Sequence, residues 1–259
     1  MDDVAILQQL DHERRTLVRD DEVMEVLPDV TRLRPSDGAY HDVVYSALTA
    51  ESADAVILEQ VSHYRSLGAQ FEWCVYSHDR PADLLDRLNR HGFSIGPKET
   101  VVVLDLADAP AWAREWPQCV VRVQSADQVR LFRDAAAEVF AKDYGVTAGQ
   151  LLRAIEARSR QHVGYLAMVD GAVAGVGRLY THPNSAFGGL YGGGTRAPFR
   201  GRGLYRALVA ARARDALQRG ARYLIVDALP TSRPILERLG FRRVADTWPC
   251  TWTPPALLP

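Results

Sequence analysis

The sequence has 259 residues, of which 47% are hydrophobic, so it can form more than one compact core. Its 31 basic and 32 acidic residues give a formal net charge of −1, and the basic residues do not gather in runs. Because binding to a nucleic-acid backbone depends on clustered positive charge, this balance argues against a nucleic-acid-binding protein.

Other residue types exclude further classes of protein. The three cysteines, Cys74, Cys119 and Cys250, form no CxxC pair, so we expect reduced thiols. The seven histidines show no metal-ligand spacing, and no GxSxG motif indicates a hydrolase. No run approaches the ~20 apolar residues of a membrane-spanning helix, and the start lacks the features of a signal peptide. We therefore expect a cytoplasmic protein with no metal and no membrane partner.

The first half of the chain contains a short pattern that recurs later. Residues 71–77 predict a strand, residues 81–90 a helix that closes at Gly92-Phe93, and residues 100–106 another strand. The order of strand, helix and Gly-Phe recurs at residues 223–241. This parallel suggests an internal repeat, although so short a pattern also arises by coincidence. Residues 107–118, which include Pro110 and Pro117, then predict a linker.

Beyond the linker, a second series of strands and helices indicates a separate unit. Five elements come first: strands over 120–123, 164–169 and 173–180, and helices over 126–141 and 147–160. The last two of these strands are joined by an Asp170-Gly171 turn. A glycine-rich strand, a turn and a helix from Leu204 to Gly220 come next, and residues 223–229 predict a buried strand. A short helix from Ser232 ends at Gly240-Phe241, and residues 242–252 supply the last strands.

The turn before Leu204 is the most informative segment. A helix start leaves its first amide N–H groups without intrahelical partners and carries the positive end of the helix dipole, so it can hold a pyrophosphate. Gly201 and Gly203 lack the Cβ atoms that would block its approach. The GxGxxG spacing fails because Arg206 stands at the third glycine, and GxxxxGK[ST] is absent. An ordinary connector between strand and helix is the alternative.

The segment Arg200-Gly201-Arg202-Gly203-Leu204-Tyr205 resembles the [RQ]xxGx[GA] signature of the GNAT superfamily of N-acyltransferases, which bind acetyl-CoA. Arg200 and Gly203 match its first and fourth positions, while Tyr205 departs from the sixth. The downstream strand and the short helix ending in Gly-Phe resemble the same superfamily in order and spacing. The resemblance implies an α/β (α+β) fold with a central mixed, mostly antiparallel sheet flanked by helices, and the internal repeat implies that this fold is duplicated.

This resemblance implies a tandem organisation. We expect residues 1–110 to form a degenerate GNAT-like domain, residues 111–119 a linker, and residues 120–259 the catalytic N-acetyltransferase domain. The N-terminal domain has no Arg/Gly turn, so we expect it not to bind coenzyme. Its expected role is to cover one side of the catalytic unit or to shape the acceptor cleft.

The resemblance also implies which residues contact the coenzyme. In GNAT enzymes the strand before the turn is splayed from its neighbour, and the pantetheine arm enters the gap. Glycines in that strand admit close approach, although a structural bulge explains them nearly as well. The residues expected to contact acetyl-CoA, as a co-substrate, are Gly193, Gly194, Thr195, Arg200, Gly201, Arg202, Gly203, Leu204, Tyr205 and Ser232.

The general acid and base are less defined. Many GNAT relatives have a tyrosine four residues before the glycine of Gly-Phe, where this chain has Leu236, and a glutamate on the strand before the turn, where residues 185–195 contain no acid. The candidates are Tyr191, for contact with the acyl group or acceptor, and Asp227, as a base or an anchor for a cationic amine. A strand-end carboxylate that caps the Thr231 region is the alternative for Asp227.

The sequence therefore predicts an N-acetyltransferase that moves an acetyl group from acetyl-CoA to the primary amine of a small molecule. The alternative is an acyl-CoA-binding regulatory or structural module without turnover, which Leu236 and the missing strand glutamate favour. The expected partner is the small-molecule amine, and a homodimer is left open.

Overall fold

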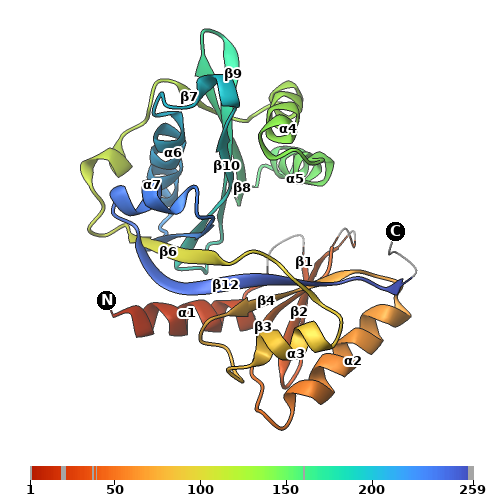
Figure 1. The fold of residues 1–259 in the computed structure, drawn as a ribbon. Helices are drawn as coiled ribbons and strands as arrows, with labels where there is room; N and C mark the ends of the chain where they lie inside the picture. The colour runs from red at the N-terminus through yellow and green to blue at the C-terminus, as the bar shows by residue number, and fades with distance from the viewer. Residues whose placement is uncertain (1, 19–21, 37, 39, 160, 256–259) are drawn as a thin grey trace. The chain divides into compact units, whose positions relative to one another are not determined.

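The computed structural model describes residues 2–18, 22–36, 38, 40–159 and 161–255. The chain folds into two compact units, whose elements are labelled in Figure 1. Unit 1 comprises residues 1–102, 227–233 and 243–259, and unit 2 comprises residues 103–226 and 234–242. The C-terminal segment thus belongs to the same unit as the N-terminal segment. The domain limits expected from the sequence stay a prediction.

Unit 1 is built on strands that pair mostly antiparallel. Strands β1 (Glu22–Val26), β2 (Val30–Pro35) and β3 (Asp42–Ser46) follow one another in this way. Strand β3 then lies parallel to β4 (Phe71–Tyr76), and helix α2 (Ala53–Ser66) makes the crossover that a parallel pair requires. The last strand of the chain, β12 (Arg242–Trp252), pairs antiparallel with β4 and with the short β5 (Ser94–Ile95).

The alternation of side chains along β4 gives unit 1 its two faces. On one face, its buried residues join helices α2 and α3 (Leu84–Arg90) in a single core: Phe71, Trp73 and Val75. Helix α1 (Asp3–Thr16) packs on the opposite face, where the Arg14 guanidinium lies 3.7 Å from the ring centroid of Tyr76. The Arg14 Nη2 atom also donates a hydrogen bond of 3.3 Å to the carbonyl oxygen of Cys74.

The strands of unit 2 include β10, which is central to the site described below. Their order is β11 (Tyr223–Ala228), β10 (Phe187–Thr195), β9 (Ala172–Thr181), β8 (His162–Val169) and β7 (Val120–Arg122). Only β10 and β11 are parallel, and the other neighbours are antiparallel. Helices α4 (Ala126–Phe140) and α5 (Gly145–Glu156) cover one face, and α6 (Leu204–Gln218) covers the other (Figure 1). Strand β6 (Glu99–Asp105) and helix α7 (Arg233–Arg238) have residues in both units.

Local sequence signals explain where these elements begin and end. Ser125 caps α4 because its Oγ accepts a hydrogen bond of 3.3 Å from the backbone N–H of Gln128. Asp170 and Gly171, with φ of 49° and 78°, make the predicted tight turn between β8 and β9. Gly220, with φ of 81°, follows the C-cap of α6 in the left-handed conformation that ends helices.

The predicted fold class is confirmed, because a mixed and mostly antiparallel sheet is flanked by helices. Three details differ from the prediction. The helix expected from Pro81 begins at Leu84, the linker contains a 3₁₀ helix over Ala111–Arg114, and residues 242–252 form one long strand rather than several.

Three further observations concern side chains and helices of the described residues. All three cysteines are free thiols. The described residues contain no group of three or more metal-ligating side chains. No helix among them is long and apolar enough to cross a membrane.

Candidate functional site

Strands β10 and β11 diverge after a short stretch of pairing. They pair at Phe187–Tyr223, Gly188–Leu224 and Gly189–Ile225, and among the described residues their pairing ends there. On its other edge, β10 stays paired with β9 as far as Thr195, with a bulge between Tyr191 and Gly194. From Leu190 onward, one edge of β10 is therefore not paired with β11. Such an edge presents backbone N–H and C=O groups that can pair with an extended, amide-containing ligand.

Close packing explains the glycines at the end of β10. Gly192 lies in the bulge with φ of 52°. A Cβ on Gly194 would lie 2.4 Å from Cγ1 of Val139, and a Cβ on Gly193 would lie 3.0 Å from Nη2 of Arg212. These glycines let α4 and α6 approach the strand, so by themselves they do not indicate a ligand.

The turn between β10 and α6 is open on its outer side. Gly201 and Gly203 have φ of 77° and 74°, and a Cβ at either residue would meet no atom within 4 Å. The first intrahelical bond runs from the N–H of Ala207 to the carbonyl of Gly203, at 3.0 Å. The N–H groups of residues 204–206 therefore have no intrahelical acceptor. Open space in front of free amides at a helix start is a cradle for an anion.

Charge and one unsatisfied hydroxyl add to this cradle. Arg200, Arg202 and Arg206 are exposed around the helix start. The Nε atom of Arg200 donates a hydrogen bond of 3.3 Å to the carbonyl oxygen of Thr195. Oγ1 of Thr195 is buried and has no hydrogen-bond partner among the described residues. These features fit the phosphate and amide groups of a CoA molecule.

An ion pair with a buried carboxylate holds α6 against the sheet. Asp215 of α6 is 1% exposed and accepts hydrogen bonds from Nε of Arg122, at 2.7 Å, and from the hydroxyl of Tyr165, at 2.6 Å. Burial and the neighbouring Asp215 carboxylate hold the pKa of Tyr165 well above its ordinary value, so this hydroxyl stays a donor. Because the ion pair anchors α6, the amides at its first turn have a defined position.

Most of the residues predicted to contact the coenzyme lie together in unit 2. Residues from Gly193 to Tyr205 occupy the end of β10, the turn and the first turn of α6. The side chain of Leu204 is buried, so it presents only its backbone. Tyr191 is 39% exposed on β10, opposite Arg178 of β9, whose guanidinium lies 5.8 Å from the Tyr191 ring centroid.

The two remaining predicted residues, Ser232 and Asp227, belong to unit 1. Ser232 Oγ donates a hydrogen bond of 3.2 Å to the carbonyl of Leu229. Asp227 makes no hydrogen bond to any described residue, so the Thr231 region is not capped by its carboxylate. Although part of Asp227 is exposed, desolvation by the surrounding protein raises the pKa of its carboxyl to about 6. Among its neighbours, the Arg14 cation lowers this pKa and the Glu72 carboxylate raises it.

Sequence reasoning missed two carboxylates that interact with Asp227 within unit 1. Glu99 on β6 has its pKa raised to about 7, first by desolvation and then by the charges of Asp227 and Glu72. Glu72 lies on β4, on the same face as Cys74. Glu72 is the only acid of β4, and Glu99 begins β6, an apolar strand that ends at Asp105, so the sequence offered little signal for either.

The predicted absence of a tyrosine acid also has a structural consequence. Leu236 of α7 is fully buried, so an aliphatic side chain fills the position where many relatives carry a tyrosine. This position therefore offers no side chain that could protonate the departing CoA thiolate.

The site and fold match known proteins. Residues 128–241 match the model of the acetyltransferase (GNAT) family. The chain therefore contains a GNAT-family domain. This makes the protein an acyltransferase, and the family implies acetyl-CoA as acyl donor. No curated protein matches the chain.

Solved structures of GNAT proteins share the fold over nearly the whole chain. A GCN5-related N-acetyltransferase from Kribbella flavida is 16% identical, with a TM-score of 0.68, over 98% of this chain and 95% of that one. A GCN5-related N-acetyltransferase from Sphaerobacter thermophilus is 15% identical, with a TM-score of 0.61, over 96% and 91%. A tandem GNAT protein from the clavulanic acid biosynthesis pathway is 15% identical, with a TM-score of 0.56, over 91% and 84%. At these identities the likeness concerns the fold alone.

Proposed function

We propose that this GNAT protein transfers an acetyl group from acetyl-CoA to the primary amine of a small molecule. The observation that carries the proposal is the divergence of β10 from β11 directly before an open, glycine-containing helix start. A cytoplasmic location belongs to the same proposal.

The donor would bind along β10 and at the start of α6. The pyrophosphate of acetyl-CoA would lie in the open space at Gly201 and Gly203 and accept hydrogen bonds from the free amides of residues 204–206, next to Arg200 and Arg202. The amides of its pantetheine arm would pair with the free edge of β10, and the unsatisfied Thr195 Oγ1 adds a polar group at the end of this strand. Arg200 thus supplies positive charge, whereas Gly203, which has no Cβ, leaves room for the pyrophosphate.

The chemistry follows from the groups that an acyl transfer needs. The amine nitrogen forms a bond to the thioester carbonyl carbon, the carbon–sulfur bond breaks, and the amine loses a proton. A backbone N–H on the free edge of β10 would polarise the carbonyl. The departing thiolate is a tolerable leaving group near neutral pH, so the buried Leu236 does not prevent turnover.

The carboxylates of unit 1 support a cationic acceptor. A primary amine with a pKa of about 10 arrives protonated at neutral pH and has to lose a proton before it attacks. Asp227, whose pKa is raised to about 6, is mostly ionised at neutral pH and is a stronger base than an ordinary aspartate. Together with Glu72 and Glu99 it would attract the ammonium group, and Asp227 would accept its proton.

A second function rests on a specific observation. The described part of β10 carries no acidic residue, and Leu236 replaces the tyrosine of many relatives. These features favour an acyl-CoA-binding module without turnover. It would bind acetyl-CoA at the same turn.

The first experiment is a calorimetric titration of the full chain with acetyl-CoA, with CoA and ATP as controls. Binding of both CoA forms but not of ATP supports the donor site. A panel of small primary amines, with acetylated products detected by mass spectrometry, then separates the two functions. Binding without any product supports the module, and no binding overturns both.

Arg200→Ala tests the donor site directly. It removes a cation beside the pyrophosphate position, so we expect acetyl-CoA affinity to fall about tenfold. Unchanged affinity would remove Arg200 from the site.

A further inference from the structure

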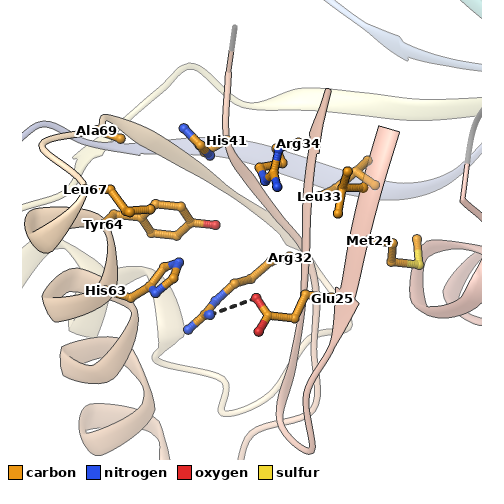
Figure 2. Close-up of a pocket in the computed structure, with 11 residues that line it drawn as sticks. Met24, Glu25, Arg32, Leu33, Arg34, His41, His63, Tyr64, Leu67 and Ala69 are labelled. Carbon is orange, nitrogen blue, oxygen red and sulfur yellow. Dashed lines mark hydrogen bonds and ion pairs between the residues drawn. The ribbon is translucent and has the colours of Figure 1, made fainter. Parts of the chain in front are cut away.

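Unit 1 contains a cavity of about 700 Å³ between helix α2 and the hairpin of β1 and β2. Figure 2 shows its lining, with side chains of the hairpin facing those of the C-terminal half of α2. A cavity of this size is in the range that small-molecule ligands occupy. It is formed entirely by unit 1 and has no residue of the Arg/Gly turn in its lining.

The polar part of the cavity is centred on Tyr64 of α2. Its ring is buried and stacks on Phe71 at 4.1 Å between centroids, while its hydroxyl points into the cavity (Figure 2). The hydroxyl makes no hydrogen bond to any described residue. His63 and His41 flank it, with ring centroids 4.8 Å and 5.4 Å from that of Tyr64. The cavity thus presents one hydroxyl and two imidazoles to a ligand.

The two arginines of the lining differ in their partners. Arg32 donates to Oε1 of Gln60 at 2.7 Å and to Oε2 of Glu25 at 3.0 Å, so its charge is compensated. Arg34 is exposed and makes no ion pair or hydrogen bond to any described residue. One uncompensated cation therefore faces the cavity.

The charges around His41 are also positive. Burial lowers its pKa, and the charges that act on it, from Arg34 and His63, lower it further. At His63 the Arg32 cation also lowers the pKa, while Glu25 and Glu59 raise it. The charged and titratable groups around the cavity are Glu25, Arg32, Arg34, His41, Asp42, Glu59, His63 and Tyr64.

The rest of the lining is apolar. Val23 of β1 and Leu67, which follows α2, are exposed by 43% and 57%, and Ala69 also lines the cavity. Exposed aliphatic side chains at the rim of a cavity can be covered by the body of a ligand.

We propose that this cavity binds an amphipathic organic carboxylate, with the carboxylate between Arg34, His41 and the Tyr64 hydroxyl and its apolar body against Val23 and Leu67. The carboxylate forms an ion pair with Arg34, which has no such partner among the described residues, and accepts a hydrogen bond from the Tyr64 hydroxyl. It also stabilises the protonated form of His41. Because binding raises the pKa of His41 from its lowered value, affinity increases as the pH falls through the pKa of the bound form.

The test is titration of the full chain with 2-naphthoate, followed by calorimetry, with the neutral isostere 2-naphthamide and with acetate as comparisons. We expect 2-naphthoate to bind at least about tenfold more tightly than either comparison, because only it has both the charge and the apolar body. We also expect tighter binding at pH 6 than at pH 8.

Two matched variants locate the site. Arg34→Met removes the uncompensated cation, and Arg90→Met removes another exposed arginine of unit 1, which does not line the cavity. We expect only Arg34→Met to weaken 2-naphthoate binding, by about tenfold, and saturating acetyl-CoA to leave that binding unchanged. The proposal is overturned by no binding at about 10 mM, by equal effects of the two variants, or by competition with acetyl-CoA.

Discussion

Two segments of this chain share a plan and differ at the turn. In unit 2, β10 leads through the turn into α6 and then to the parallel strand β11. In unit 1, β3 leads through residues 47–52 into α2 and then to the parallel strand β4. Each pair of parallel strands is hydrogen-bonded over only a few residues among those described. The same local architecture therefore occurs in both units.

The starts of the two helices present opposite chemistry. Before α6 the turn has two glycines in the left-handed conformation and exposed arginines. Before α2, side chains close the turn: Thr49 N–H donates to Ser52 Oγ at 3.0 Å, and Ser52 N–H donates to Thr49 Oγ1 at 3.2 Å. Acidic Glu51 and Asp54 also lie at this helix start, where they would repel a phosphate. An anion cradle thus needs free amides, space and positive charge together, beyond the strand and helix alone.

The strands that follow the helices end differently as well. After β4, Asp79 accepts a hydrogen bond of 2.8 Å from the Tyr76 N–H and lies 3.7 Å from Arg14. In β11, Asp227 has no hydrogen bond from the described residues. The carboxylate of Asp79 is bonded within the protein, whereas that of Asp227 is bonded to no described residue.

The largest expected effect comes from filling the open turn. Gly203→Glu places a side chain and a negative charge where the pyrophosphate would lie, so we expect acetyl-CoA affinity to fall by about 100-fold or more in calorimetry. Gly220→Glu is the matched control, since Gly220 also has a positive φ, of 81°, and open space at its Cβ. If both variants lose affinity equally, backbone strain rather than a blocked cradle is the cause.

Asp227→Asn tests the contrast between the two aspartates. We expect kcat to fall about 100-fold with an amine substrate, because the base is removed, while acetyl-CoA affinity stays unchanged. The rate of the unmodified enzyme should rise with pH through about 6, as Asp227 ionises, and the variant should lack this rise. Asp86→Asn, an exposed aspartate of α3, is the control. A variant that keeps the pH profile would exclude Asp227 as the base.

Glu99→Gln tests the carboxylates that surround Asp227. The pKa of Glu99 in the folded state, about 7, lies above its ordinary value, so the folded protein binds more protons than the unfolded one between those pH values. Stability therefore falls as the pH rises through this range. Glu99→Gln removes this titration. The unfolding free energy of the variant, minus that of the unmodified protein, should therefore rise by roughly 1 kcal/mol from pH 5 to pH 8, after allowance for solvent screening.

Urea unfolding at both pH values measures this difference, with Glu115→Gln as an exposed control. A difference in unfolding free energy that does not change with pH would show that Glu99 titrates normally.

Thr49→Ala is expected to have the smallest effect. Loss of the hydroxyl that accepts from Ser52 N–H should cost about 1 kcal/mol of stability or less, measured by urea unfolding, and leave acetyl-CoA affinity unchanged. Thr16→Ala, at the end of α1, is the matched control. Weaker acetyl-CoA binding in Thr49→Ala would mean that the turn before α2 contributes to donor binding.

The sequence allowed much of unit 2 to be predicted because its signals are local. The Asp170-Gly171 turn and the Arg/Gly turn each depend on residues a few positions apart. Residues 1–70 contain no such motif, and we predicted none of their elements. Pairing between β12 and β4 joins residues far apart in the chain, which periodicity cannot reveal.

The candidate site divides in the same way. Its donor half is one continuous segment, so its residue types and spacing could be interpreted directly. Glu72, Glu99 and Asp227 come from three different strands, and only folding brings their charges into interaction. Asp227 was selected because it ends a strand beside the turn, whereas the two glutamates have no neighbouring motif.

The place of β12 in unit 1 has a consequence for how the protein is made. Cys250 and Trp252 are part of the unit 1 core, alongside residues of α2 and β4. A ribosome releases these residues only after all of residues 103–226 of unit 2. Unit 1 therefore stays incompletely paired until the residues of unit 2 have been made, and an expression fragment that stops before Arg242 lacks a strand of its sheet.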